Sequence, residues 1–172
     1  MIHKDIFQLE QHMPGLGVNT GYAQAKVMRA RAITKLHEAG ASILGTAVMA
    51  PYACGATSQN SNFSRCLNPL DPNWMVGGSS SGSAVAVASG MTPVSLGTDT
   101  SGSVRIPAAS CAILGLKTTP GVISTEGVMT LSPTLDTVGI LGKHVQDVQL
   151  ILNILTEVPL QDIAPAHKIA YW

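Results

Sequence analysis

Two short runs of serine and glycine are the residues in this sequence whose types and spacing could do chemistry. The first run is GGSSSGS over residues 77–83, and the second is GTDTSGS over residues 97–103. A serine hydroxyl attacks a carbonyl carbon once a base takes its proton, and small neighbours let backbone approach a ligand. The apolar stretch 84–88 that follows the first run must be buried, which a flexible linker would not need. We therefore predict that Ser79 and Ser103, 24 residues apart, meet through a helix and a return strand.

Residues 78–82 also fit a second pattern, the G-x-S-x-G nucleophile elbow, with Ser80 at its centre. The elbow needs an acid and then a histidine further along the chain. Asp136 and His144 are the pair that the sequence offers. A run of serine and glycine satisfies this pattern by composition alone, so the elbow remains the alternative to the paired runs.

The order of the motifs resembles the amidase signature family. That family carries GGSSGGS, then GTDTGGSxRxPA, then GLKPT, and this sequence has GGSSSGS at 77–83, GTDTSGSVRIPA at 97–108 and GLKTT at 115–119. Two glycines of the family pattern are replaced here, by Ser81 and Ser101. The match is long and ordered, which makes chance agreement improbable.

The resemblance also implies a base that the serine runs lack. In the family, a Lys-Asp pair at the end of a strand supplies the catalytic lysine, and Lys4-Asp5 has this form, 75 residues before Ser79. Read alone, Lys4 would be an ordinary surface lysine. The family mechanism implies that neutral Lys4 takes a proton from Ser79, which takes one from Ser103, which attacks an amide carbonyl. Because a lysine pKa is normally about 10.4, burial must lower it.

The resemblance gives further roles to the turn around the second serine. Backbone N–H groups that could stabilise the oxyanion belong to four consecutive residues, Thr100, Ser101, Gly102 and Ser103. Ser80, Asp99 and Arg105 are implied to hydrogen-bond around the lysine and serines, and Arg105 could instead pair with Asp99 to hold the turn. A positive φ at Ser101 would cost about 1 kcal/mol, and we expect serine to be tolerated there.

The hydrophobic pattern predicts an α/β fold with a mixed, largely parallel sheet flanked by helices, of the amidase-signature type. Expected helices are 23–39, ended by Gly40, then 84–89, ended by Gly90, and 145–155. Expected strands are 41–45, 91–97, 113–117, 127–131 and the start of one at 168–172, with a long irregular loop over 51–74. We expect Asp136 to cap backbone amides. Residues 1–172 are predicted to form one domain, which the resemblance implies is truncated at both ends.

Composition bounds the remaining classes of function. Ten basic and ten acidic residues give a formal net charge of zero, which argues against nucleic-acid binding. No apolar run reaches the length of a membrane span, and the N-terminus does not read as a signal peptide, so a soluble, cytoplasmic protein is expected. Cys54, Cys66 and Cys111 lack metal-site spacing and read as reduced, core-type residues, and neither metal nor cofactor is expected.

Hydrolysis of a small-molecule amide to a carboxylate and ammonia or an amine is the activity that the resemblance implies. Two alternatives stay open: an inactive truncated remnant of an amidase, and an amidotransferase subunit that passes ammonia to a charged tRNA with the help of partner chains. Charged residues make up only 12% of the chain and hydrophobic ones 45%. We therefore expect association with a second copy or with the missing parts of the domain.

Overall fold

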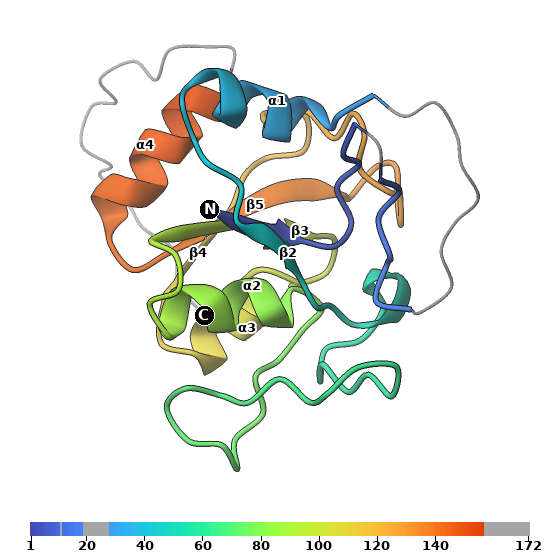
Figure 1. Ribbon diagram of the computed structural model, residues 1–172, viewed down its shortest axis with the longest axis vertical. Coiled ribbons are helices and arrows are strands. Elements are labelled where there is room, and N and C mark those ends of the chain that lie inside the picture. Colours follow the sequence, from blue (N-terminus) through green and yellow to red (C-terminus); the bar gives the residue numbers. More distant parts are fainter. Residues whose placement is uncertain (11, 19–27, 157–172) are drawn as a thin grey trace.

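A five-stranded sheet with the order β2-β1-β3-β5-β4 is the centre of the computed structural model, which describes residues 1–10, 12–18 and 28–156 (Figure 1). The strands are β1 Ile2–Lys4, β2 Gly45–Ala47, β3 Val94–Asp99, β4 Leu114–Lys117 and β5 Thr137–Gly142. β1 pairs in parallel with β2 and β3, whereas β5 runs antiparallel to β3 and β4. β5 alone opposes the other strands of this sheet, so the predicted mixed, largely parallel arrangement is confirmed.

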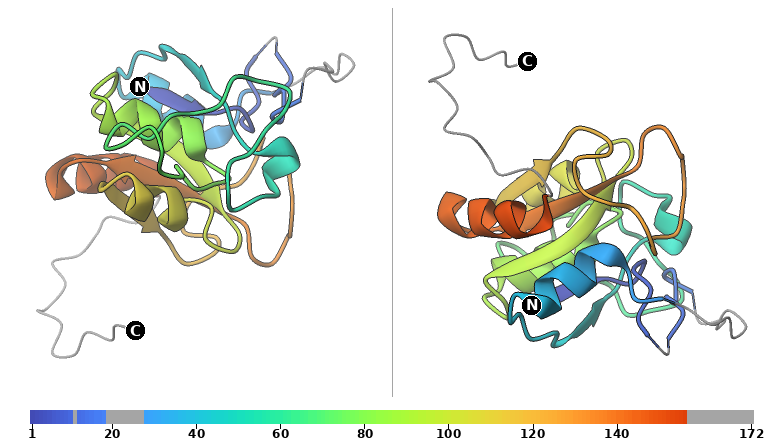
Figure 2. Two further views of the ribbon diagram at one scale, coloured as in Figure 1. Left: turned by 90° about the horizontal axis from the view of Figure 1, so that it is seen from below. Right: turned by 90° about the horizontal axis from the view of Figure 1, so that it is seen from above.

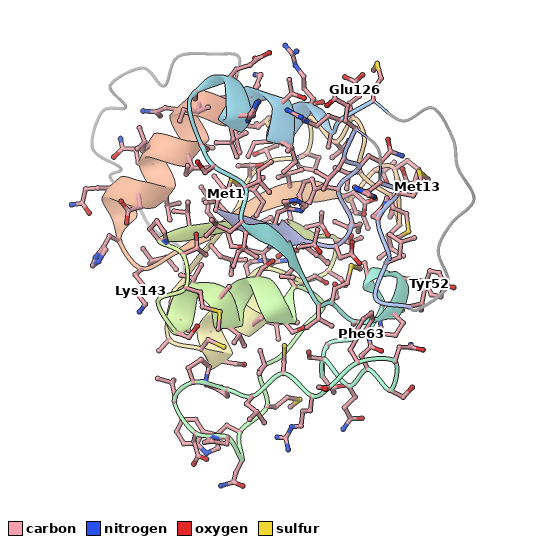
Figure 3. All side chains as sticks on the ribbon, viewed as in Figure 1. Met1, Met13, Tyr52, Phe63, Glu126 and Lys143 are labelled. Carbon is pink, nitrogen blue, oxygen red and sulfur yellow. The ribbon has the colours of Figure 1, made fainter. Side chains whose placement is uncertain are left out.

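Helices cover both faces of this sheet. α1 Arg31–Glu38 and α4 Val145–Leu155 lie on one face, and α2 Ser81–Ala88 and α3 Arg105–Ser110 lie on the other (Figure 2). Side chains fill the space between each helical layer and the sheet (Figure 3). Ile140 belongs to the core under α1 and α4, and its neighbour Leu141 belongs to the core under α2 and α3, because side chains alternate along a strand.

The N-terminal boundary of the first predicted helix is wrong where the structure describes it. The helix begins at Arg31, and Met28–Ala30 are not helical because the N–H of Ala30 donates to the Gln8 carbonyl and that of Arg31 to the Glu126 carbonyl. Its end at Gly40 is confirmed, with φ +89°. Residues 23–27 and the strand expected at 168–172 lie outside the described residues.

Two predicted strands need correction. The strand expected at 41–45 begins only at Gly45, where pairing with the three residues of β1 begins, and Leu44 is 65% exposed. The strand expected at 127–131 is a single bridge between Phe7 and Val128. Gly127 has a φ of +74°, which turns the chain immediately before that bridge and keeps a longer ladder from forming.

Two elements were not predicted, β5 and α3. Glycine is unfavourable in a strand, yet Gly139 of β5 is needed because a Cβ there would lie 2.8 Å from the Leu116 carbonyl oxygen. α3 carries Pro107 at its third position, where the first turn of a helix tolerates proline. The helices expected at 84–89 and 145–155 and the strand expected at 113–117 are present, each within a few residues of its predicted bounds.

The long loop expected at 51–74 is confirmed as irregular apart from the 3-10 turn Pro51–Ala53, and it extends away from the sheet (Figure 1). Buried Asn68 anchors it by donating to the carbonyls of Met75 and Ser110. The loop and the residue that follows it expose several large apolar side chains: Phe63, Leu67, Leu70, Trp74 and Met75. No helix in the described ranges is long and apolar enough to cross a membrane.

The three cysteines are free thiols, as expected. Their predicted location in the core is correct for Cys111, which is buried, and wrong for Cys54, which is exposed on the irregular loop. Burial raises the pKa of the Cys111 thiol to about 11, so that thiol is not a reactive nucleophile near neutral pH.

Replacing Ile151 with alanine tests the packing of α4 on the sheet. Ile151 is 8% exposed and faces the core, so Ile151→Ala should lower the free energy of unfolding by about 2–4 kcal/mol. The neighbouring Leu150 is 58% exposed, and Leu150→Ala should change it by about 0.5 kcal/mol or less. Equal losses for the two variants, measured by urea unfolding, would contradict this packing.

Candidate active site

The candidate site lies at the edge of the sheet where parallel strands β1 and β3 end. Lys4 is the last residue of β1, and Asp99 is the last residue of β3. Ser79 is held at this edge because its carbonyl accepts the N–H of Ala50 at 3.1 Å. The backbones of the two serine runs meet here, as predicted from their spacing. The carboxyl ends of parallel strands are a common location for binding sites.

The amine of Lys4 is completely buried in this edge, with 0% of the residue exposed. Its Nζ donates to Ser79 Oγ at 2.7 Å and to Thr98 Oγ1 at 2.8 Å. Burial lowers the pKa of Lys4 to about 7, against the raising effect of the carboxylates of Asp99 and Asp136. A large fraction of the amine is therefore neutral near pH 7, which is the state a base requires.

The second serine lies close to this pair through its backbone. The N–H of Ser80 donates to the carbonyl of Ser103 at 3.1 Å, which joins the two serine runs. Ser79 is buried and Ser103 is half-buried. Among the described residues, the hydroxyl of Ser103 forms no hydrogen bond, whether to Ser79 or to another group. The structure thus brings Lys4 to Ser79 directly and leaves the Ser103 hydroxyl uncommitted.

The turn that carries Ser103 is organised by the buried carboxylate of Asp99. It accepts hydrogen bonds from the N–H groups of Gly102 and Val104 at 2.8 and 3.1 Å. The Arg105 guanidinium adds two more, at 3.0 and 2.9 Å. Burial alone would raise the pKa of Asp99, but Arg105 and these N–H groups together hold it below its usual range. The ion pair between Arg105 and Asp99, one of the two interpretations of Arg105, is therefore present.

The backbone donors of this turn are not equivalent. Gly102 directs its N–H to Asp99, whereas the N–H groups of Thr100, Ser101 and Ser103 donate to none of the described residues. Gly102 is the residue of this turn with a positive φ, at +122°, so Ser101 is not strained. The expectation that serine is tolerated at position 101 has a direct structural reason, since its backbone lies outside the left-handed region.

Ser80 supports the site from beneath, and the nucleophile-elbow alternative is wrong. Ser80 is 0% exposed, and its hydroxyl donates to the carbonyl of Thr98 at 3.3 Å. His144 follows the far end of β5, away from the edge that carries Lys4.

Asp136 accepts the N–H groups of Leu131 and Ser132, which confirms its expected capping role. It also accepts the hydroxyl of Thr100 at 2.5 Å.

Thr98 is the contact of the lysine that sequence reasoning did not single out. A threonine inside a strand is ordinary, and the family resemblance directed attention to its neighbour Asp99 instead. The pairing of β1 with β3 brings Thr98 to the Lys4 amine. Within the described ranges, no three His, Cys, Asp or Glu side chains gather to hold a metal ion.

Comparison with known proteins identifies the family. The family model described as Amidase matches residues 4–164, which include both serine runs and Lys4. The chain belongs to the amidase family. The resemblance seen in the motifs is thereby confirmed, and the fold agrees with it. A solved structure described as "Crystal structure of amidase" superposes with a TM-score of 0.85 at 37% identity, over 94% of this chain and 38% of that one.

Curated relatives in the family carry different names. A glutamyl-tRNA(Gln) amidotransferase subunit of Pelodictyon phaeoclathratiforme is 45% identical over 75% of this chain and 27% of its own length. The pea protein (Pisum sativum) named translocon at the outer membrane of chloroplasts 64 is 40% identical over 90% of this chain and 26% of its own length. The chain thus spans about a quarter of these relatives, and membership does not by itself fix one activity.

A further solved structure is that of the corresponding glutamyl-tRNA(Gln) amidotransferase subunit from Thermotoga maritima. It superposes with a TM-score of 0.83 at 33% identity and covers 92% of this chain and 35% of that one. The helices and strands that build the edge around Lys4 are therefore those of the family.

The buried amine predicts a pH-dependent stability. Between pH about 7 and 10.5 the unfolded state holds a proton on Lys4 that the native state lacks, so the free energy of unfolding rises with pH there. Lys4→Met removes this titration. The stability of the wild type minus that of the variant should increase by about 1.4 kcal/mol per pH unit across the window. Urea unfolding at several pH values measures it, and parallel curves would show that Lys4 stays protonated in the native state.

The turn predicts opposite responses at two adjacent positions. Gly102→Ala should lower the free energy of unfolding by about 1–2 kcal/mol, because φ there is +122° and a Cβ would lie 2.8 Å from Ile106 Cδ1. Ser101→Gly should change it by no more than about 1 kcal/mol, since Ser101 is exposed and unstrained. Thermal unfolding of both variants provides the comparison. A larger loss of stability in Ser101→Gly than in Gly102→Ala would contradict a positive φ at Gly102 and an unstrained Ser101.

Proposed function

We propose that this protein hydrolyses amide bonds by acyl transfer to a serine, with Ser103 as nucleophile, Ser79 as the bridging hydroxyl and Lys4 as base. The observation that carries the proposal is the Lys4 amine, 0% exposed, 2.7 Å from Ser79 Oγ and with its pKa lowered to about 7. A lysine is costly to bury, and ordinary packing gives no reason to hold one beside a serine.

The proton path follows from these contacts. Neutral Lys4 accepts the proton of Ser79, and Ser79 Oγ draws the proton from Ser103 as Ser103 Oγ forms a bond to the carbonyl carbon. The hydroxyls of Ser79 and Ser103 are not hydrogen-bonded to each other here, although Ser79 Oγ accepts from Lys4 Nζ. Catalytic hydrogen bonds in ligand-free proteins often form fully only when substrate is bound. The proposal requires that the uncommitted Ser103 hydroxyl donate to Ser79 Oγ in the substrate-bound protein.

The negative charge on the carbonyl oxygen needs donors that are free to meet it. The N–H groups of Thr100, Ser101 and Ser103 donate to no described residue, which supports their role in an oxyanion hole. The loss of one such donor typically raises the activation barrier by about 2.7–4 kcal/mol. In this proposal Gly102, whose N–H is bound to Asp99, shapes the turn instead of binding the oxyanion.

Collapse of the tetrahedral intermediate completes the first half of the reaction. The C–N bond breaks, and the leaving nitrogen receives the proton held on Lys4 through Ser79. Water then attacks the acyl-serine ester while the same relay takes its proton, which releases a carboxylate and restores Ser103. These steps require neither a metal nor a cofactor.

The free thiols Cys66 and Cys111 suit a reducing compartment, and we propose the cytoplasm.

A second candidate function is glutamine hydrolysis within an amidotransferase. It is favoured by the 45% identity to a protein named as a glutamyl-tRNA(Gln) amidotransferase subunit. The same relay would release ammonia from the glutamine side chain, and partner chains would carry the ammonia to its acceptor. Glutamine in a panel of amides distinguishes the two, because a general amidase should prefer simple carboxamides in the absence of partners.

Ammonia release from a panel of aliphatic and aromatic carboxamides tests the proposal. Ser103→Ala and Lys4→Ala should each lower kcat/KM by at least about 10³-fold, because each removes one member of a unit that acts together. Ser89→Ala is the matched control, since Ser89 is exposed and its hydroxyl donates only to the carbonyls of α2. Activity that survives both substitutions would contradict the relay, and no release by the unmodified protein would favour a fold without turnover.

A further inference from the structure

The hydrogen-bonding partners of the Lys4 amine pose a question that the relay alone does not answer. Within the described residues, Nζ contacts two oxygen atoms, Ser79 Oγ at 2.7 Å and Thr98 Oγ1 at 2.8 Å. Thr98 is 6% exposed, so water does not readily take its place. A neutral amine has two N–H donors and one lone pair, and only the lone pair can accept the proton of Ser79. The direction of that lone pair therefore decides whether the amine can work as a base.

Resting on the proposed function, we propose that Thr98 is a positioning residue: its hydroxyl oxygen accepts one N–H of Lys4 and so leaves the lone pair directed at Ser79. The two oxygens lie 2.7 and 2.8 Å from Nζ. When Thr98 Oγ1 accepts one N–H of the neutral amine and the Ser79 hydroxyl donates its proton, the lone pair is the one acceptor on Nζ that this hydroxyl can meet. Without an acceptor at position 98, Ser79 Oγ would be the one oxygen of the described residues left within hydrogen-bond distance of Nζ, and the N–H groups of the neutral amine would compete with its lone pair for that position.

The position of Thr98 makes this contact rigid. Its N–H and carbonyl both contact the hydroxyl of buried Ser80, at 3.4 and 3.3 Å. β3 is fully buried along its length and pairs with β1 on one side and β5 on the other. An acceptor fixed on a central strand holds an angle more accurately than one on a loop.

Titratable or charged side chains near Nζ could also orient the amine. Titratable or charged side chains around it are Asp99 at the end of β3, Asp136 before β5, Arg105 on α3, and His3 and Asp5 on either side of Lys4. Asp99 is paired with Arg105, and Asp5 accepts the N–H of Gly15. α2 and β2 contribute no titratable side chain. None of these groups forms a hydrogen bond with Nζ in the described chain, so Thr98 is the partner left to orient it.

Removal of this acceptor should move the titration of the lysine in a defined direction. An ammonium has three donors and benefits more from an acceptor than a neutral amine does, so Thr98→Val should lower the Lys4 midpoint by about half a unit to one unit. Poorer packing would admit water instead and raise the midpoint toward the ordinary lysine value. The direction in which the Lys4 midpoint moves in Thr98→Val therefore distinguishes an acceptor that orients the amine from a threonine that only fills space.

The measurement is NMR of the protein labelled with ¹³C at lysine Cε, with the Lys4 signal assigned by its loss in Lys4→Met. Thr98→Ser keeps the acceptor and should return the midpoint to the wild-type value. Thr92→Val is the control, because Thr92 is also buried, precedes the opposite end of β3, and its hydroxyl donates to the Val94 carbonyl. That substitution should leave the Lys4 midpoint unchanged.

The pH profile of kcat/KM adds a second readout. Thr98→Val should lower the plateau by about 10-fold or more and shift its acidic limb to lower pH, in step with the NMR midpoint. A midpoint in Thr98→Val that stays the same or rises would overturn the positioning role. The NMR titration needs no turnover, so it judges Thr98 even if Ser103→Ala shows that the proposed relay is wrong.

Discussion

The structure depends on excluding water from the amine of Lys4. Burying a lysine is unfavourable unless the amine is neutral or hydrogen-bonded, and here the surroundings of Lys4 provide both conditions. Two glycines make the enclosure tight. A Cβ at Gly82 would lie 2.6 Å from the carbonyl oxygen of Val48, and one at Gly97 would lie 2.7 Å from Ser80 Oγ. The serine and glycine runs therefore pack the site closely, in addition to supplying hydroxyls.

Asp99 is a second buried ionisable group at the same edge of the sheet. Asp99 and Lys4 lie at the ends of paired strands, yet their environments act in opposite senses. Burial dominates at Lys4 and lowers its pKa to about 7, whereas Arg105 and backbone donors outweigh burial at Asp99 and hold its pKa below the usual range. Groups whose environments push their pKa values apart are typical of sites that transfer protons. Asp99 holds the turn through these contacts, whereas the Lys4 amine contacts only Ser79 and Thr98 among the described residues.

The sequence allowed much of this arrangement to be predicted, for identifiable reasons. The spacing of Ser79 and Ser103 implied a helix and a returning strand, and the family resemblance pointed to Lys4, which composition would have assigned to the surface. β5 was not predicted because Gly139 weakens the strand pattern of its sequence. Glycine is required there by the close approach of the Leu116 carbonyl oxygen on the neighbouring strand. Thr98 escaped because its importance arises from a strand pairing that no local pattern encodes.

The reversed direction of β5 has a consequence for how this fold can vary. β1 and β3 deliver Lys4 and Asp99 from their carboxyl ends, whereas β5 reaches the same edge with its amino end and brings Asp136 from the preceding connection. That connection, from the end of β4 to β5, lies outside the parallel pair β1 and β3, so its length and composition can vary while the strand pairing that places Lys4 beside Thr98 is kept. A change in that connection would instead act on the turn that carries Ser103, because Asp136 accepts the hydroxyl of Thr100 in that turn.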